Sequence, residues 1–381
     1  MQRSQRKFPW QTLLVILFFV ASGVLCSWLN REKLLYFAQT ENVWDRIWHF
    51  AILLGCMYLA MVVQTVIHEL GHLFFGFLTG YRFCSFRVGP LMLVKSRGRL
   101  RLKKFSLAGT GGQCLMIPPD LKDGKLPVVL YNLGGSILNF MVAGLCLMCC
   151  TFLPWVKFLW EFLLMAAVIG FAYALTNGVP LRMGILNNDG YNAIRLGKNP
   201  EAMRAWWIQL KASQQVAEGV RVKDMPADWF AMPDEEGLRN SITATLAVFA
   251  CNRLMDEHRF SEADALMEKL LDADAALVGL HRRLLINDRI YCGLTSGKDK
   301  TQLQALRTKQ QRRFENSMQH HLSVLRTQYT WALLLDNDSK TADKFRKRFR
   351  NCARSYPYLC EMEAEQALMK LARDRLLAEK E

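Results

Sequence analysis

The sequence predicts an α-helical membrane protein with about four transmembrane helices, a small cytoplasmic β-hairpin insertion and, after these, an all-α cytoplasmic domain. Three observations predict this fold class. Four long stretches near the start contain no charged side chain apart from Glu69. One loop between them is strongly basic. The remainder of the chain is charged, mixed in sign and rich in helix-forming residues.

These stretches are residues 8–30, 47–81, 126–156 and 162–181, and Glu69 is the one charged residue within them. A helix of roughly 20 residues crosses a bilayer, so each stretch is long enough, and the two longer ones cross with tilt or continue beyond the bilayer. We therefore expect helices at 10–29, 48–79, 131–153 and 159–179. The basic start of the first stretch also fits a signal peptide, but its length favours a retained helix.

The distribution of basic residues indicates the orientation. The 81–127 loop carries ten Lys or Arg and two acidic residues, and basic loops stay cytoplasmic. We expect a multi-pass protein of the cell membrane, most simply a bacterial one, with both termini cytoplasmic. The net charge of +15 belongs mainly to this topology, and no nucleic-acid motif accompanies it, so we expect no nucleic-acid partner.

The tail, residues 195–381, contains one well-patterned stretch at 246–274. Its apolar spacing predicts two helices broken near His258–Phe260, packed as a hairpin. The hairpin resembles a tetratricopeptide unit with Ala263 in the packed small-residue position. An array needs about three repeats, so an ordinary helical bundle is almost equally favoured. Either form could bind a protein partner.

The segment HELGH, at 68–72, combines two histidines and a glutamate inside a predicted membrane helix. His68 and His72 lie one turn apart on one helix face, where they can occupy two positions of a tetrahedral zinc site. Glu69 can take the proton of a water whose pKa the zinc lowers. Ionisable groups in a membrane span are costly and mark function by default, so the motif predicts peptide hydrolysis. Gly71 would allow another segment to approach closely.

These features together resemble the site-2 proteases, a family of zinc metalloproteases that cut peptide bonds within or beside the membrane. The resemblance covers about residues 48–194. It comprises HELGH, the segment 86–118, the segment NLGGSILNF at 132–140 and the segment TNGVPLRMGILNNDGYN at 176–192. It implies a β-hairpin at 86–118, Asp189 as the third zinc ligand, and a set of residues around the active site, here called the surround, that can donate hydrogen bonds to the substrate or to an oxyanion. The surround comprises Asn139, Asn177, Pro180, Gly111 and Gly112.

Asp189 is also favoured without the family. A hydrolytic zinc has three protein ligands and an open position. Of the eight carboxylates in residues 1–194, Asp189 alone follows a membrane helix that ends on the side where His68 and His72 lie. The adjoining Asn and Gly residues favour a turn that aims this carboxylate toward the helices. The alternative is that NNDG is simply a surface turn.

The predicted domains are an N-terminal helix and outer loop at 1–45, a membrane-embedded metalloprotease core at 46–194 and a cytoplasmic helical domain at 195–381. The predicted function is zinc-dependent cleavage of membrane-spanning or membrane-associated substrates, such as regulatory proteins, signal-peptide remnants or peptide precursors. The alternative is a non-catalytic membrane scaffold that displays the helical domain and holds a structural or decayed zinc site.

Overall fold

The computed structural model describes residues 42–105, 111–152, 157–183 and 186–378. The helix predicted at 10–29 lies outside these residues. The chain divides into two compact units. Of the described residues, the first unit contains 42–79, those from 127 to 183 and 187–195, and the second contains those from 80 to 126, residue 186 and 196–378.

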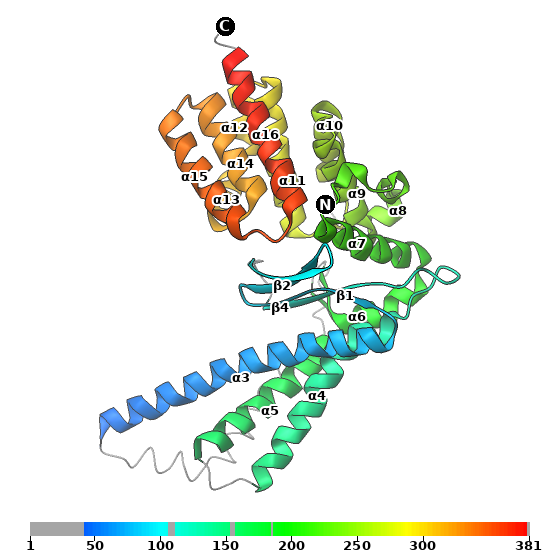
Figure 1. Ribbon diagram of the computed structural model, residues 1–381, viewed down its shortest axis with the longest axis vertical. Coiled ribbons are helices and arrows are strands. Elements are labelled where there is room, and N and C mark those ends of the chain that lie inside the picture. Colours follow the sequence, from blue (N-terminus) through cyan, green and yellow to red (C-terminus); the bar gives the residue numbers. More distant parts are fainter. Residues whose placement is uncertain (1–41, 106–110, 153–156, 184–185, 379–381) are drawn as a thin grey trace, which may run out of the picture. The chain divides into compact units, whose positions relative to one another are not determined.

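Three long apolar helices make up most of the first unit. They are α3 (Val43–Leu78), α4 (Val128–Phe152) and α5 (Lys157–Gly178). Each is long and apolar enough to cross a membrane, as predicted for 48–79, 131–153 and 159–179. The described part of the chain thus contains three helices that are long and apolar enough for three of the four predicted crossings. A ribbon of β5 (Arg182–Met183) and β6 (Leu186–Asn187) leads to α6 (Asp189–Arg195), at the end where the three helices converge (Figure 1).

Glycines set the distance between α3 and α4. A Cβ atom built on Gly71 would lie 2.3 Å from the carbonyl oxygen of Gly134, and one built on Gly134 would lie 2.5 Å from the carbonyl oxygen of Gly71. The backbones therefore touch directly, because neither position has a side chain to separate them. This confirms the close approach predicted at Gly71.

The second unit contains a four-stranded antiparallel sheet in the order β3-β2-β1-β4. Its strands are β1 (Arg82–Val88), β2 (Leu91–Ser96), β3 (Arg99–Lys104) and β4 (Gly112–Ile117). The predicted hairpin at 86–118 is therefore too small. Residues 86–118 contain three whole strands, β2, β3 and β4, and the sheet begins earlier with β1, which pairs with β2 on one side and β4 on the other and so joins them into one sheet.

The sheet belongs to the same unit as the tail, which differs from the predicted division into 46–194 and 195–381. Cys84, Met92, Val94 and Ile117 of the sheet form one buried cluster with Ala217 of α7 (Pro200–Glu218). The physical reason is the apolar face of the sheet, which needs a covering layer and receives it from a helix distant in sequence.

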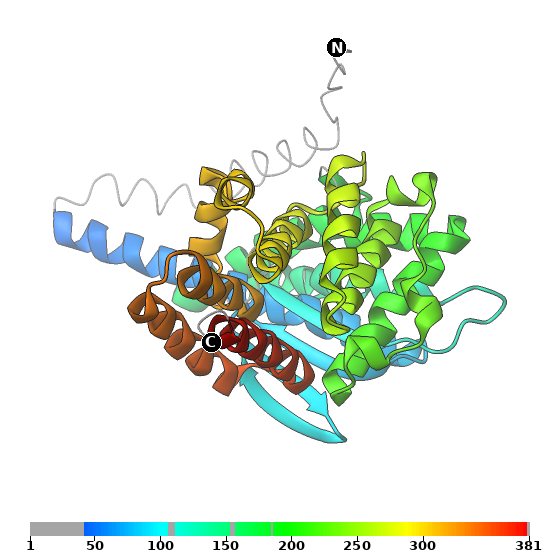
Figure 2. The ribbon, with the colours of Figure 1, turned by 90° about the horizontal axis from the view of Figure 1, so that it is seen from above.

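The tail is all-helical, as predicted (Figures 1 and 2). In Figure 2, α7–α10 in green and α11–α16 in yellow to red form two neighbouring groups of helices. After α7 come α8 (Glu235–Leu238), α9 (Ser241–Asp256), α10 (Phe260–Asp272), α11 (Gly279–Ser296), α12 (Lys300–Leu306), α13 (Lys309–Ser317), α14 (Leu322–Thr330), α15 (Ser339–Ser355) and α16 (Leu359–Ala378). Single turns occur at Leu196–Lys198, Val222–Asp224, Ala227–Phe230 and, in π-helical form, Trp331–Leu335.

The hairpin predicted at 246–274 is confirmed as α9 and α10. The chain turns between them at His258, which has a positive φ of 60°. Ala263 is fully buried between the helices, in the small-residue position expected for it.

Candidate metal centre

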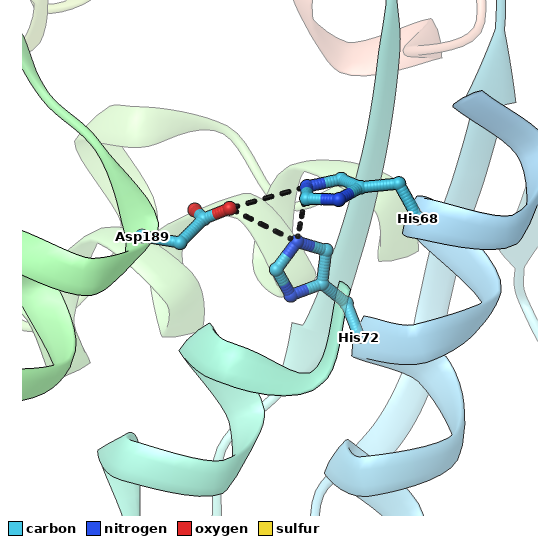
Figure 3. A group of neighbouring side chains, drawn as sticks. All are labelled: His68, His72 and Asp189. Carbon is cyan, nitrogen blue, oxygen red and sulfur yellow. Dashed lines mark hydrogen bonds and ion pairs between the residues drawn. The ribbon is translucent and has the colours of Figure 1, made fainter. Parts of the chain in front are cut away.

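Two histidine side chains leave the same face of α3 and point toward Asp189 (Figure 3). His68 and His72 are four residues apart, so their rings lie one turn apart on that face. Both are buried, and so is Glu69 between them in sequence. The charge-free flanks make α3 helical across this whole region, and the α-helical repeat alone brings the two imidazoles together.

Asp189 completes a group of three metal-binding side chains. Its Oδ2 atom lies 3.2 Å from Nε2 of His68 and 3.4 Å from Nε2 of His72, and the two Nε2 atoms are 3.2 Å apart. A tetrahedral ion with bonds of about 2.0–2.2 Å holds neighbouring ligand atoms about 3.3–3.6 Å apart. The three separations lie within about 0.1 Å of this range, so the group fits a zinc ion with a fourth position left for water.

Both histidines are oriented through their other ring nitrogen. Nδ1 of His72 lies 2.8 Å from the carbonyl oxygen of Tyr131 and must donate to it. Nδ1 of His68 lies 2.7 Å from Oδ1 of Asn139, whose amide nitrogen donates to Gln64. Each Nδ1 therefore carries a proton and Nε2 of each ring faces Asp189, so a bound metal ion would take the Nε2 lone pair of both rings. Such outer hydrogen bonds are typical of histidine metal ligands.

Asp189 is positioned by the residue before it. Oδ1 of Asn188 accepts hydrogen bonds from the backbone amides of Leu181 and Tyr191, both at 2.9 Å. Its amide nitrogen donates to the carbonyl oxygens of Thr176 at 2.7 Å and Val179 at 2.6 Å. Asn188 thus caps the start of α6 and ties it to the end of α5. Asp189 opens a helix, and Asn188 and the next residue, Gly190, are buried, so NNDG is not a surface turn.

The electrostatics of Asp189 follow from this packing. Burial raises the pKa of its carboxyl group, but hydrogen bonds from His68 and His72 outweigh burial and hold that pKa well below its ordinary value. The carboxylate is therefore charged at neutral pH, as a metal ligand must be.

The predicted surround is only partly brought to this group. Asn139 contacts His68, and its amide nitrogen donates within the helices to Gln64. Asn177 donates to the carbonyl oxygen of Tyr173 one turn earlier in α5, at 3.0 Å. Pro180 lies between α5 and β5. Gly111 and Gly112 lie at the start of β4 in the second unit.

Two residues that contribute to the site, Gln64 and Asn188, were not among the site residues predicted from the sequence. Gln64 is completely buried, one turn before His68, and bonds both to Asn139 and to the carbonyl oxygen of Ala166 on α5. Its signal in the sequence was a polar residue at the same four-residue spacing as the histidines. Asn188 had a weaker signal, because an Asn before an Asp predicts a turn as readily as a helix cap.

The fold and the site together define a helical protein, suited to a membrane by three of its helices, with a candidate two-histidine, one-aspartate metal centre. Comparison with models of known protein families, with curated proteins and with solved structures finds no match to this chain. The functional argument therefore rests on the residues and on their geometry.

Proposed function

We propose that this protein is an intramembrane zinc metalloendopeptidase of the site-2 protease type. One observation carries the proposal. Two Nε2 atoms and a carboxylate oxygen lie at zinc-ligand spacing beside a buried glutamate, on a helix apolar enough to cross a membrane. A buried group of this kind in such a helix is costly unless function requires it.

The residues of the chain have separate roles in this reaction. His68, His72 and Asp189 would hold the ion. Zinc, when bound, supplies a Lewis acid that lowers the pKa of a water molecule in its open position. Glu69 accepts the proton of the attacking water and delivers it to the leaving amide nitrogen. Asn139 and Tyr131 keep the imidazoles in the orientation that this requires.

The substrates in this proposal are membrane-spanning or membrane-associated polypeptides. The ten-to-two excess of basic residues in the 81–127 loop supports a cytoplasmic position for that loop and for both termini. Water would then reach the site from the cytoplasmic side, near the end of α3 where the histidines lie.

A non-catalytic scaffold with a structural zinc site is the competing function. Structural zinc sites are closed by four protein ligands, whereas the described residues supply three at this position. A structural site also has no use for a buried carboxylate beside its ligands. Both features favour the enzyme.

The test compares the wild type with Glu69→Gln, purified in detergent and supplied with a synthetic transmembrane peptide. Zinc content is measured by elemental analysis and cleavage by mass spectrometry. The variant keeps the shape of the side chain and removes its basicity, so it should retain zinc and lose cleavage by several orders of magnitude. Absence of zinc and of cleavage in the wild type, or full activity in the variant, would overturn the proposal.

A further inference from the structure

The second unit contains a cavity of about 330 Å³ that the metal centre does not use. Its walls are one face of each of four tail helices, α9, α11, α14 and α16. The lining residues recur every three or four positions, for example Glu361, Ala364, Glu365 and Leu368 of α16. This volume lies in the range of ligand sites, about 300–1,000 Å³.

The charged residues of this cavity are predominantly acidic. Asp256, Asp288, Glu361 and Glu365 face two guanidinium groups, those of Arg221 and Arg326. His321 adds no positive charge at neutral pH, because burial lowers its pKa to about 4. Burial raises the pKa of Glu361 and raises that of Glu365 to about 7, so a cation entering the cavity would stabilise the ionised form of these two carboxylates.

Glu361 is the carboxylate that most needs a cation. Arg221 pairs with Asp256, and Arg326 pairs with Asp288 and, at 3.2 Å, with Glu365. Glu361 accepts a hydrogen bond from the hydroxyl of Tyr356 at 2.8 Å, and no basic side chain among the described residues forms an ion pair with it. A partly buried carboxylate without a cationic partner is costly, and a positively charged ligand would relieve that cost.

Aromatic rings lie beside Glu361. Phe105, Tyr356 and Tyr358 line the cavity, and their ring centres are 5.7–6.2 Å apart in edge-to-face contacts. Rings next to a carboxylate attract ammonium and guanidinium groups through cation–π interactions. The combination distinguishes this cavity from an ordinary acidic surface.

The cavity also offers a buried donor. Arg326 is almost completely buried, and its Nε atom has no hydrogen-bond partner among the described residues. A peptide would supply a Lys or Arg side chain for Glu361 and carbonyl oxygens that can accept from Arg326 once its side chain turns toward the ligand. A simple amine would supply only the first.

We propose that this cavity binds a Lys- or Arg-containing segment of a polypeptide, namely the basic flank beside the membrane helix of a substrate. The choice of a substrate flank rests on the proposed function, because cytoplasmic flanks of membrane helices are enriched in Lys and Arg. The second unit thereby selects substrates by charge, separately from the chemistry of the metal centre.

The binding test uses full-length Glu69→Gln protein in detergent and a short fluorescein-labelled peptide with Lys-Arg-Lys in an Ala-Ser frame. Fluorescence anisotropy reports its dissociation constant. Glu361→Gln removes the unpaired charge at constant size, and Ala364→Leu fills the cavity without changing charge; each should weaken binding about tenfold or more. Glu363→Gln is the matched control, because Glu363 is exposed on the same helix and does not line the cavity.

Three outcomes would overturn the inference. The first is that the peptide does not bind. The second is that the Glu361→Gln and Ala364→Leu variants bind the peptide as tightly as the Glu363→Gln control. The third is that a peptide with Glu in place of Lys and Arg binds equally well. Displacement by spermidine at or below the peptide's own dissociation constant would also overturn it, in favour of a polyamine site.

A cleavage experiment separates this inference from the proposed function. With Glu69 intact, Glu361→Gln should raise KM about tenfold for a transmembrane peptide with a basic flank. It should leave kcat unchanged and have no effect on a peptide with a neutral flank. If Glu361→Gln leaves the KM for the basic-flank peptide unchanged, the role of the cavity is refuted, whereas the proposed protease function is not. Glu361-dependent binding by a protein without zinc or cleavage refutes the proposed protease and leaves a peptide-binding cavity.

Discussion

The close approach of α3 and α4 at Gly71 predicts a strong effect of adding one methyl group there. In Gly71→Ala the new Cβ atom would lie 2.3 Å from the carbonyl oxygen of Gly134, where ordinary contacts begin near 3.4 Å. The helices α3 and α4 must therefore separate locally by about 1 Å, since the obstructing atoms belong to the backbone and cannot rotate away. Overpacking of this kind costs about 1–3 kcal/mol.

The same displacement reaches the metal ligands. Asn139 and the carbonyl group of Tyr131 belong to α4, and they hold His68 and His72 of α3 at 2.7 and 2.8 Å. Moving the helices apart by about 1 Å breaks both hydrogen bonds, whereas a metal site tolerates about 0.2 Å. Loss of such outer-shell partners typically reduces metal affinity 10–100-fold.

The assay is a competitive zinc titration with a chromogenic chelator, together with thermal unfolding, on protein purified in detergent. Gly55→Ala is the control, because a Cβ at Gly55 of the same helix meets nothing within 4 Å. This control should bind zinc normally and be up to about 1 kcal/mol more stable, from helix propensity. If Gly71→Ala binds zinc within twofold of the wild type, the close-packing argument is wrong.

Four further predictions concern individual residues and the ion. Asn188→Ala should lower zinc affinity about 10–100-fold, because α6 loses its cap, and equal titration curves for variant and wild type would contradict this. Asp189→Asn should lose zinc in elemental analysis, whereas Asp123→Asn, in the second unit, should keep it. Chelation of zinc should lower the thermal midpoint, with about 4 kcal/mol lost if free zinc was a thousand times Kd; an unchanged midpoint would show that the ion does not stabilise the fold. Burial raises the pKa of Glu365 to about 7; Arg326 partly offsets this, and neighbouring carboxylates add to it. The pKa of Glu365 is higher in the folded than in the unfolded protein, so its protonated form contributes to the stability of the fold. This contribution is complete below about pH 4.5 and is lost as the pH rises through 7. Hydrogen exchange in α16, corrected for intrinsic rate, should show about 1 kcal/mol less protection at pH 8 than at pH 6, and Glu365→Gln should abolish the difference.

The long helices were predictable because their signal is local. A stretch without charge that is long enough for a bilayer has few alternative structures, and the starts and ends of α3, α4 and α5 lie within about five residues of the expected ones. The pairing of His68 with His72 follows from the helical repeat alone. Both inferences need only residues that are near each other in sequence.

The remaining features depend on contacts between distant residues. The strand β1 was missed because its partners, β2 and β4, follow it at very different separations, and register between strands is set by packing. Asn188 has four hydrogen bonds, and the one to Thr176 spans twelve residues. Its sequence neighbours therefore could not show whether it caps a helix or begins a turn. The unit boundaries differed for a similar reason, since Ala217 covers a sheet formed more than a hundred residues earlier.

The separation of the three ligands along the chain has a consequence for biosynthesis. His68 and Asp189 are 121 residues apart, and they belong to helices that are synthesised at different times. A nascent chain that has released α3 but not α6 carries both histidines and the glutamate but lacks the carboxylate that completes the set. Such a chain cannot assemble the proposed centre until α6 has left the ribosome and met α3.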